Sequence, residues 1–146
     1  MYQVGKVLSL YISKKGISQP NEQSEIEVDI KGIINDKHYN KDLERSILIT
    51  SAKSYELVKS HMIEIPYGIL GENLLIDFNP YSLPMGSQLK IGNAILEISQ
   101  NCTLCNHLSK VDKQLPKLLK NDRGIFGKVL QAGSIKVGDK IYLLED

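Results

Sequence analysis

Cysteine is scarce in this chain and net charge is almost absent. Among its 146 residues there are two cysteines, Cys102 and Cys105, and the formal net charge is +1. A chain so close to neutrality has no global field that would recruit nucleic acid or an anionic membrane. It also lacks an apolar run approaching the roughly 20 residues of a membrane-spanning helix. Its N-terminus lacks the basic and apolar regions of a signal peptide. We therefore expect a cytoplasmic protein that binds neither nucleic acid nor a membrane.

The sequence has no linker and no low-complexity run, which predicts a single domain over residues 1–146. Short segments that are apolar, or in which apolar and polar residues alternate, predict β-strands. These segments lie at 4–12, 26–30, 46–50, 74–78, 123–130 and 140–144.

Helices are fewer and shorter. Ser51 is a suitable N-cap for a helix over 52–60, and Pro116 divides a second helical stretch into two short helices. Two similar segments, 89–95 and 135–141, place Gly-Asn or Gly-Asp between apolar residues, which predicts two tight hairpins. Many short strands with few helices predict a mainly β barrel.

Cys102 and Cys105 directly follow the second predicted strand of the first hairpin. In the cytosol such a pair is usually reduced, and it is more often catalytic or metal-binding than a structural disulfide. A reactive thiolate at this position could carry sulfur or bind a soft metal.

Three other interpretations of the cysteine pair stay open. The pair could form half of a zinc site with His107 as a third ligand, although the chain has no second cysteine pair. It could form a reversible disulfide, although a thioredoxin-like motif belongs to an α/β pattern that this chain does not show. The thiols could also be inert small side chains packed under a helix.

A turn-rich stretch at 32–42 concentrates polar functional groups, among them Asp36, Lys37 and His38. Cations and backbone dipoles in such a loop could bind a phosphate or another anion, although a solvated surface loop has a similar composition. Arg45 follows shortly after, before an apolar strand. Its guanidinium is the best bidentate anion clamp nearby, and an ordinary surface charge is the alternative.

Taken in order, these segments resemble the landmarks of the MOSC domain, which is named for the C-terminal region of molybdenum-cofactor sulfurases. The stretch 32–38 is similar to the family's Gly-Asp-Arg-His loop, and 86–98 to the Gly-x-x-Leu-x-Ile-Gly-x-Ala hairpin that leads to the family's cysteine. The other landmarks are an opening strand at 4–10, an arginine-led strand at 45–49, a Glu-Asn segment at 68–74 and a closing signature at 123–129 and 133–139. The chain thus resembles a small stand-alone MOSC domain over nearly its whole length.

The resemblance implies a mainly β fold, a MOSC-type β-barrel with a few short helices, and a pocket over a cysteine. Cys105 falls best on the family's functional cysteine, with Cys102 as an assisting or resolving thiol. That cysteine would carry sulfur as a persulfide, or bind the molybdenum of a molybdopterin cofactor, so Cys105 is also the expected metal ligand. The residues expected to bind the cofactor are Asp36, Lys37, His38, Arg45, Asn73 and Arg123.

Two residues depart from the family's loop. Asn35 stands where a glycine is expected and Lys37 where an arginine is expected. Asparagine tolerates a positive φ, so we expect the turn to survive, whereas lysine lacks the planar bidentate grip of arginine on a phosphate.

The implied activity is that of a sulfurtransferase, or of a component of a molybdenum-cofactor-dependent oxidoreductase. The chain lacks the pyridoxal-phosphate domain of the sulfurases, so we expect no such cofactor on it and infer a separate partner: a sulfur donor such as a cysteine desulfurase, or a molybdoenzyme acceptor. The alternative is a non-enzymatic β-barrel binding module whose cysteine pair is structural or binds zinc.

Overall fold

Short β-strands make up most of the regular structure, as the sequence predicts. The computed structural model describes residues 1–17, 20–103 and 108–144. The strands of this part of the chain are β1 (Tyr2–Ile12), β2 (Asn21–Gln23), β3 (Glu25–Asp29), β4 (Gly32–Ile33), β5 (Ile47–Ser51), β6 (Leu74–Ile76), β7 (Gln88–Ile91), β8 (Ala94–Asn101), β9 (Ile125–Gln131), β10 (Gly133–Lys136) and β11 (Lys140–Leu144). Its helices are α1 (Ala52–Ser60), α2 (Leu108–Val111), α3 (Leu115–Leu118) and the 3-10 helix η1 (Leu43–Arg45).

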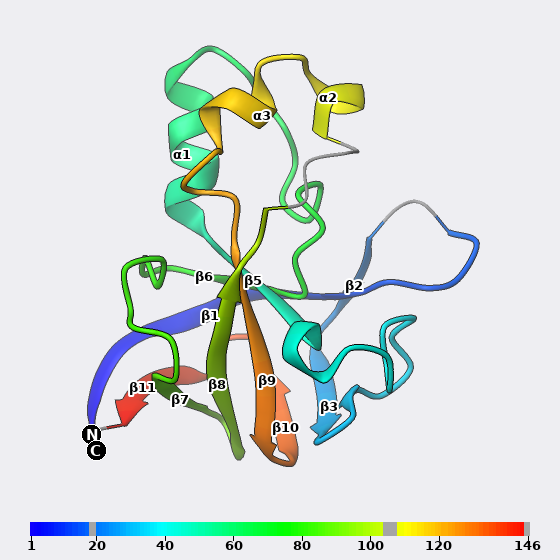
Figure 1. Cartoon of the computed structure of the whole chain (residues 1–146), viewed down its shortest axis with the longest axis vertical. Helices are drawn as coiled ribbons and strands as arrows, with labels where there is room; N and C mark the ends of the chain where they lie inside the picture. The colour runs from blue at the N-terminus through cyan, green and yellow to red at the C-terminus, as the bar shows by residue number, and fades with distance from the viewer. Residues whose placement is uncertain (18–19, 104–107, 145–146) are drawn as a thin grey trace.

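Seven of these strands form a closed barrel in the order β11-β7-β8-β9-β5-β6-β1, and pairing of β1 with β11 closes it (Figure 1). Neighbouring strands are antiparallel, except that β5 and β6 run parallel because α1 lies between them in the chain. The alternating apolar residues of these strands point inward and form a buried core that includes Leu10, Ile49, Leu96 and Ile141. The predicted fold class is therefore confirmed.

The first of the two predicted hairpins is correct and the second is wrong. Strands β7 and β8 pair in register around a turn at Gly92, whose φ is 57°. The segment 135–141 instead leaves one sheet and enters another: β10 pairs with β3 in a three-stranded sheet with β4, and β11 pairs with β1 and β7. The turn between them is held by β1, because the Gly138 amide donates to the Val7 carbonyl and the Val7 amide to the Asp139 carbonyl, each over 2.9 Å.

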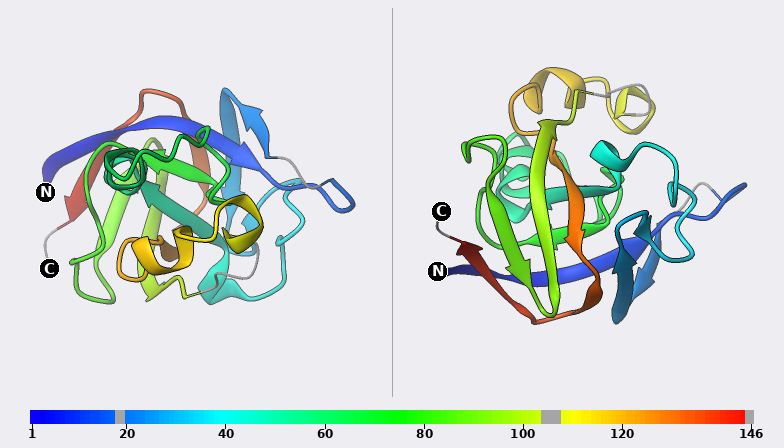
Figure 2. Two further views of the ribbon diagram at one scale, coloured as in Figure 1. Left: turned by 90° about the horizontal axis from the view of Figure 1, so that it is seen from above. Right: turned by 60° about the horizontal axis from the view of Figure 1, so that its bottom comes forward.

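All three α-helices gather at one end of the barrel (Figures 1 and 2). Helix α1 begins as predicted, with the Ser51 side chain accepting a hydrogen bond from the Lys53 amide at 3.1 Å. Helix α3 begins at Leu115, one residue before the proline at which the sequence predicts a second short helix. Apolar side chains from the three helices, from β6 and from the segment before β6 form a second buried cluster: Tyr55, Val58, Leu70, Leu75, Leu108, Leu115 and Leu119. No helix among the described residues is long and apolar enough to cross a membrane.

Candidate functional site

A cleft of about 720 Å³ opens beside η1, between the loop that follows β4, the segment that precedes β6, and α2. Its lining is strongly basic. Among the residues that line it are the cationic side chains of Lys37, Lys41, Arg45, Lys110 and Arg123, with His38, against the two acids Asp42 and Glu72. Apolar side chains such as Ile17, Ile69 and Phe126 form other parts of the wall. The cleft therefore combines the charge to hold an anion with the size and apolar surface to hold an organic group.

The loop after β4 turns sharply at Asn35, whose φ is 75°. The expectation that asparagine would preserve this turn is therefore confirmed. The turn brings Asp36 inward, where it is only 5% exposed. One carboxylate oxygen of Asp36 accepts a hydrogen bond from the Ser13 amide at 2.6 Å, and the other accepts from the His38 amide at 3.0 Å. Asp36 thus holds the loop in place from beneath the cleft.

Asp36 also holds the ring of His38, because its Oδ2 lies 3.2 Å from the ring Nδ1. Burial alone would raise the pKa of the Asp36 carboxyl, but hydrogen bonds from the His38 ring and from the Ser13 and His38 amides outweigh it and lower that pKa. The carboxylate is therefore ionised at neutral pH. The other side of His38 is open, since half of its side chain is exposed and it lines the cleft.

Asn73 also lines the cleft, but the polar atoms of its side chain form hydrogen bonds within the protein. Its Oδ1 accepts a hydrogen bond from the Leu48 amide at 3.0 Å, and its Nδ2 donates to the Tyr11 carbonyl at 3.2 Å and to Asp36 at 3.4 Å. Asn73 therefore ties β5, β1 and the Asp36 loop together. Among the six residues expected to bind a cofactor, it has the clearest structural role.

Arg45 lies in η1 rather than at the start of a strand. Its Nε donates to Gln100 at 3.2 Å, and its guanidinium carbon lies 5.7 Å from the centre of the Phe126 ring, which is a cation–π distance. An ion pair with Asp42 at 3.9 Å adds a weak contact. These contacts fix the direction of a planar cation at the side of the cleft.

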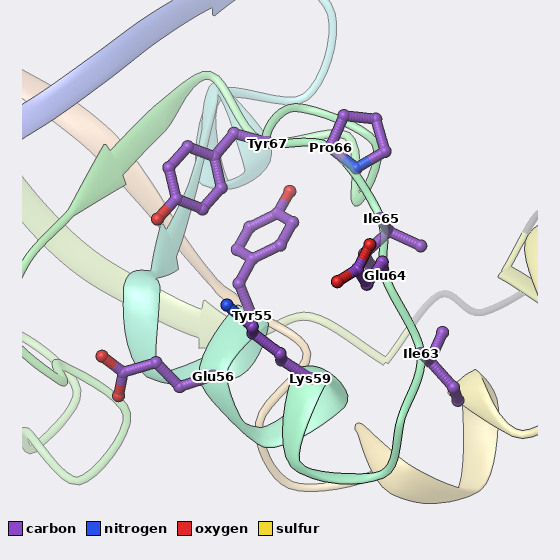
Figure 3. Close-up of a pocket in the computed structure, with 8 residues that line it drawn as sticks. All are labelled: Tyr55, Glu56, Lys59, Ile63, Glu64, Ile65, Pro66 and Tyr67. Carbon is purple, nitrogen blue, oxygen red and sulfur yellow. The ribbon is translucent and has the colours of Figure 1, made fainter.

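A buried pair of side chains that the sequence reasoning had not assigned to the site lies behind the cleft. Glu72 is 2% exposed, and its carboxylate accepts hydrogen bonds from the Tyr55 hydroxyl at 2.7 and 2.9 Å. That hydroxyl in turn accepts from the Gly68 amide at 2.9 Å and the Leu70 amide at 3.3 Å. Figure 3 shows Tyr55 projecting from α1 with its hydroxyl end toward the Pro66–Tyr67 turn.

Burial raises the pKa of the Glu72 carboxyl, and the Tyr55 hydrogen bond and the charge of Arg123 only partly oppose this rise. Arg123 is itself 3% exposed and reaches the cleft from just before β9. A buried carboxyl group and a buried guanidinium therefore both line the cleft, and the raised pKa of Glu72 favours the neutral form of its carboxyl group.

Cys102 is 4% exposed, packs against Leu48 and Phe126, and lines the cleft. Its amide donates to the Gly124 carbonyl at 3.0 Å, which continues the β8–β9 pairing by one residue. Cys105, which the family resemblance implies to be the functional cysteine and the metal ligand, lies outside the described residues, and so does His107. Within the described part of the chain, no three His, Cys, Asp or Glu side chains form a group suited to a metal ion.

The structure thus brings Lys37, His38, Arg45, Asn73, Cys102 and Arg123 to one cleft, with Asp36 directly beneath it. Sequence reasoning missed Lys41, Lys110, Phe126 and Glu72. Lys41 could have been found, because it lies in the turn-rich stretch 32–42 that already supplied Lys37 and His38. Glu72 could also have been found, because it stands next to Asn73 in the Glu-Asn segment at 68–74. Lys110 and Phe126 reach the cleft through long-range packing.

Comparisons with known proteins fit this architecture. The profile of the MOSC domain family matches residues 35–142. The crystal structure of the YUAD protein from Bacillus subtilis is similar, with 19% identity over 94% of this chain and 93% of that chain and a TM-score of 0.77. YiiM from Geobacillus stearothermophilus aligns with 18% identity over 97% of this chain and 76% of its own, with a TM-score of 0.80. YiiM from Escherichia coli aligns with 17% identity over 97% and 70%, with a TM-score of 0.69. Among curated proteins none matches significantly.

Proposed function

This chain belongs to the MOSC domain family, and on that premise we propose that it carries sulfur as a persulfide on a cysteine thiolate. The observation that carries the proposal is the shared lining of one cleft by a free thiol, Cys102, and by five lysine and arginine side chains. A thiolate is the nucleophile in sulfur transfer, and lysine and arginine side chains beside it could hold an anionic donor or acceptor. A thiol that was merely structural would need no such surroundings.

The two cysteines have different roles in this proposal. Cys105 is the sulfur-carrying residue, as its place in the family pattern implies, and Cys102 is the assisting thiol. The cleft then serves to admit the sulfur donor and to hold an anionic acceptor. The expected donor is a cysteine desulfurase, and the expected acceptor belongs to a molybdoenzyme or its cofactor.

Sulfur loading tests this proposal directly. The purified protein is incubated with cysteine and a cysteine desulfurase, and intact mass spectrometry should show an added sulfur atom that dithiothreitol removes. Replacing Cys105 by serine should abolish the added mass, while replacing Cys102 should reduce it. If neither cysteine acquires sulfur, the carrier function is wrong. If only the Cys102 variant fails to load, the roles of the two cysteines are reversed.

A second candidate is favoured by the size of the cleft, because a single sulfur atom does not need about 720 Å³. The residues present fit a molybdopterin. A soft thiol is a suitable ligand for molybdenum, and a phosphate group could be bound by Arg45, Lys37 and Arg123. The ring of Phe126 offers an apolar wall. Cys105 would then be the metal ligand, and the bound group would supply oxidation–reduction chemistry. Asp36 and Asn73 would contribute by holding the loops that carry these cations. Elemental analysis of freshly purified protein should then find molybdenum, and a pterin fluorescence after oxidation should accompany it.

A binding module without enzymatic activity is the remaining alternative. It predicts near-stoichiometric zinc that is lost together with the fold when a chelator is added. Zinc bound in this way, with no sulfur or molybdenum on the protein, would favour that alternative over both functions proposed above.

A further inference from the structure

A second pocket, of about 540 Å³, opens between α1 and the segment 63–67 that follows this helix (Figure 3). None of the residues that line it also lines the basic cleft. The chain passes directly from one pocket to the other, because Gly68 and Ile69, which come next in the sequence, line the cleft. The described residues thus form a site that is separate from the one to which sulfur carriage is assigned.

Two tyrosine rings form one corner of this second pocket. Tyr55 and Tyr67 meet edge to face, with ring centres 4.9 Å apart and an angle of 75° between the ring planes. The Tyr55 ring is fixed, because its hydroxyl is bonded to Glu72 and to the Gly68 amide. Tyr67 is 53% exposed. Nearly perpendicular rings turn a face toward the space between them, and the face of an aromatic ring is its negative side. The corner is therefore a preformed surface that attracts a cation, chiefly through Tyr67.

Carboxylates flank these rings from two elements. Glu64 lines the pocket from the segment after α1, and its side chain makes no hydrogen bond or ion pair with the described residues. Glu56 lines it from α1 and has only an exposed ion pair with Lys53 at 3.4 Å. Figure 3 shows the Tyr55 ring between the Tyr67 ring and the Glu64 carboxylate. The charge of Glu64 is therefore available to a ligand that reaches the rings.

The rest of the lining is apolar, apart from one cation. Ile63, Ile65 and Pro66 form the apolar part, and the two isoleucines pack against the second buried cluster. Lys59 lies one helical turn after Tyr55 in α1 and opposes the acids. Two glutamates and one lysine leave the lining with a net charge of −1. The electrostatic preference of this pocket is thus opposite to that of the basic cleft.

We propose that this pocket binds a small alkylammonium ion, whose cationic head lies against the Tyr67 ring and beside the Glu64 carboxylate. An ammonium group on a hydrocarbon frame suits aromatic and apolar walls, and such groups are the usual ligands of aromatic corners. A metal ion suits the pocket less well, because no three His, Cys, Asp or Glu side chains of the described residues form a group that could hold one. Neither cysteine lines the pocket among the described residues, so binding here does not depend on sulfur carriage.

Titration with choline, followed through the tyrosine ring signals in NMR, tests this proposal. The chain has seven tyrosines, and the signals of Tyr67 can be assigned from Tyr67→Leu. At constant ionic strength choline should shift these signals with a Kd of about 1–10 mM, as expected for a small ligand at an open site. The neutral isostere of choline, in which carbon replaces the nitrogen, should bind about fivefold more weakly. Equal binding of the two, or no saturable shift up to about 100 mM choline, would overturn the proposal.

Three substitutions at exposed positions separate the contributions to binding. Tyr67→Leu should raise the Kd for choline about fivefold, and Glu64→Gln should raise it about threefold. Lys59→Gln should lower the Kd about twofold, because it removes the opposing charge. Tyr2→Leu is the matched control, since Tyr2 is 52% exposed in β1 and lies outside the lining. With urea unfolding showing that each variant is folded, an unchanged Kd in Tyr67→Leu, or a higher Kd in Lys59→Gln, would overturn the proposal.

Discussion

Tyr55→Phe removes one oxygen atom from the buried pair behind the cleft, and the structure allows its effect to be worked out. The Tyr55 hydroxyl donates to Glu72, which is 2% exposed, and accepts from the amides of Gly68 and Leu70. Without it, Gly68 keeps its bond to Glu72 at 3.1 Å. The Leu70 amide and the Glu72 carboxylate, by contrast, each lose a partner. Leaving the buried Leu70 amide without its partner costs about 1–3 kcal/mol, and the loss of one of the Glu72 hydrogen bonds adds about 1 kcal/mol, so we expect the free energy of unfolding to fall by about 2–4 kcal/mol.

This loss should depend on pH in a definite direction. The pKa of Glu72 is raised in the folded protein, chiefly by burial, and the Tyr55 hydrogen bond opposes that rise. When folding raises the pKa of a carboxyl group, the free energy of unfolding falls as the pH increases. The fall begins near the unfolded pKa, about 4.3, and continues until the pH has passed the folded pKa. Removing the Tyr55 hydroxyl raises the folded pKa further. The destabilisation caused by Tyr55→Phe should therefore be larger at pH 8 than at pH 5.

Urea unfolding of the purified variants at the two pH values measures this effect. Tyr67→Phe is the matched control, because Tyr67 packs edge-on against Tyr55, with ring centres 4.9 Å apart, but is 53% exposed. Its hydroxyl makes no hydrogen bond to the described residues, so its loss should change the free energy of unfolding by less than about 0.5 kcal/mol. If both variants unfold at the same urea concentration, or if the loss in Tyr55→Phe is independent of pH, the reasoning about Glu72 is wrong.

Two further substitutions test the scaffold of the cleft. Asn73→Ala removes three hydrogen bonds that join two barrel strands to the Asp36 loop. We expect it to lower the free energy of unfolding by about 2–4 kcal/mol, measured by urea titration. An unchanged urea midpoint would contradict the structural role of Asn73. Asn35→Ala places an ordinary side chain at a φ of 75° and should lower the free energy of unfolding by about 1–2 kcal/mol. Asn35→Gly should leave that free energy nearly unchanged. Equal stabilities of the two variants in calorimetry would contradict the argument from backbone strain.

The sequence was informative wherever the deciding contacts are local. Ser51 predicts the start of α1 because a cap bonds only its own first turn, and Asn35 predicts its turn because a positive φ is a property of one residue. The segment 135–141 shows the limit of such arguments. The Gly-Asp turn does form, but the strand before it, β10, pairs with β3, which lies more than a hundred residues earlier. The residues of a turn do not indicate which distant strand its flanking strands will pair with.

The same limit applies to the site. The motif order of the chain pointed to Lys37, His38 and Arg45, which the structure does bring to one cleft. Lys110 and Phe126 come from α2 and β9, and their place in the cleft depends on how those elements pack on the barrel. The buried pair of Tyr55 and Glu72 could not be predicted either, because the two residues lie on different elements and meet only in the folded protein.

The pairing of β1 with β11 has a consequence for how this cleft comes into being. It joins Tyr2 to Leu143, so almost the whole chain must be in place before the ring of strands can close. Closing so long a loop carries a large entropic cost, and folds dominated by such distant contacts form slowly. The residues of β11 lie outside the lining of the cleft, yet Leu48 of β5 and Phe126 of β9 line it and belong to the ring of strands that β11 closes. Binding competence should therefore emerge late and all at once during folding, as a property of the completed barrel.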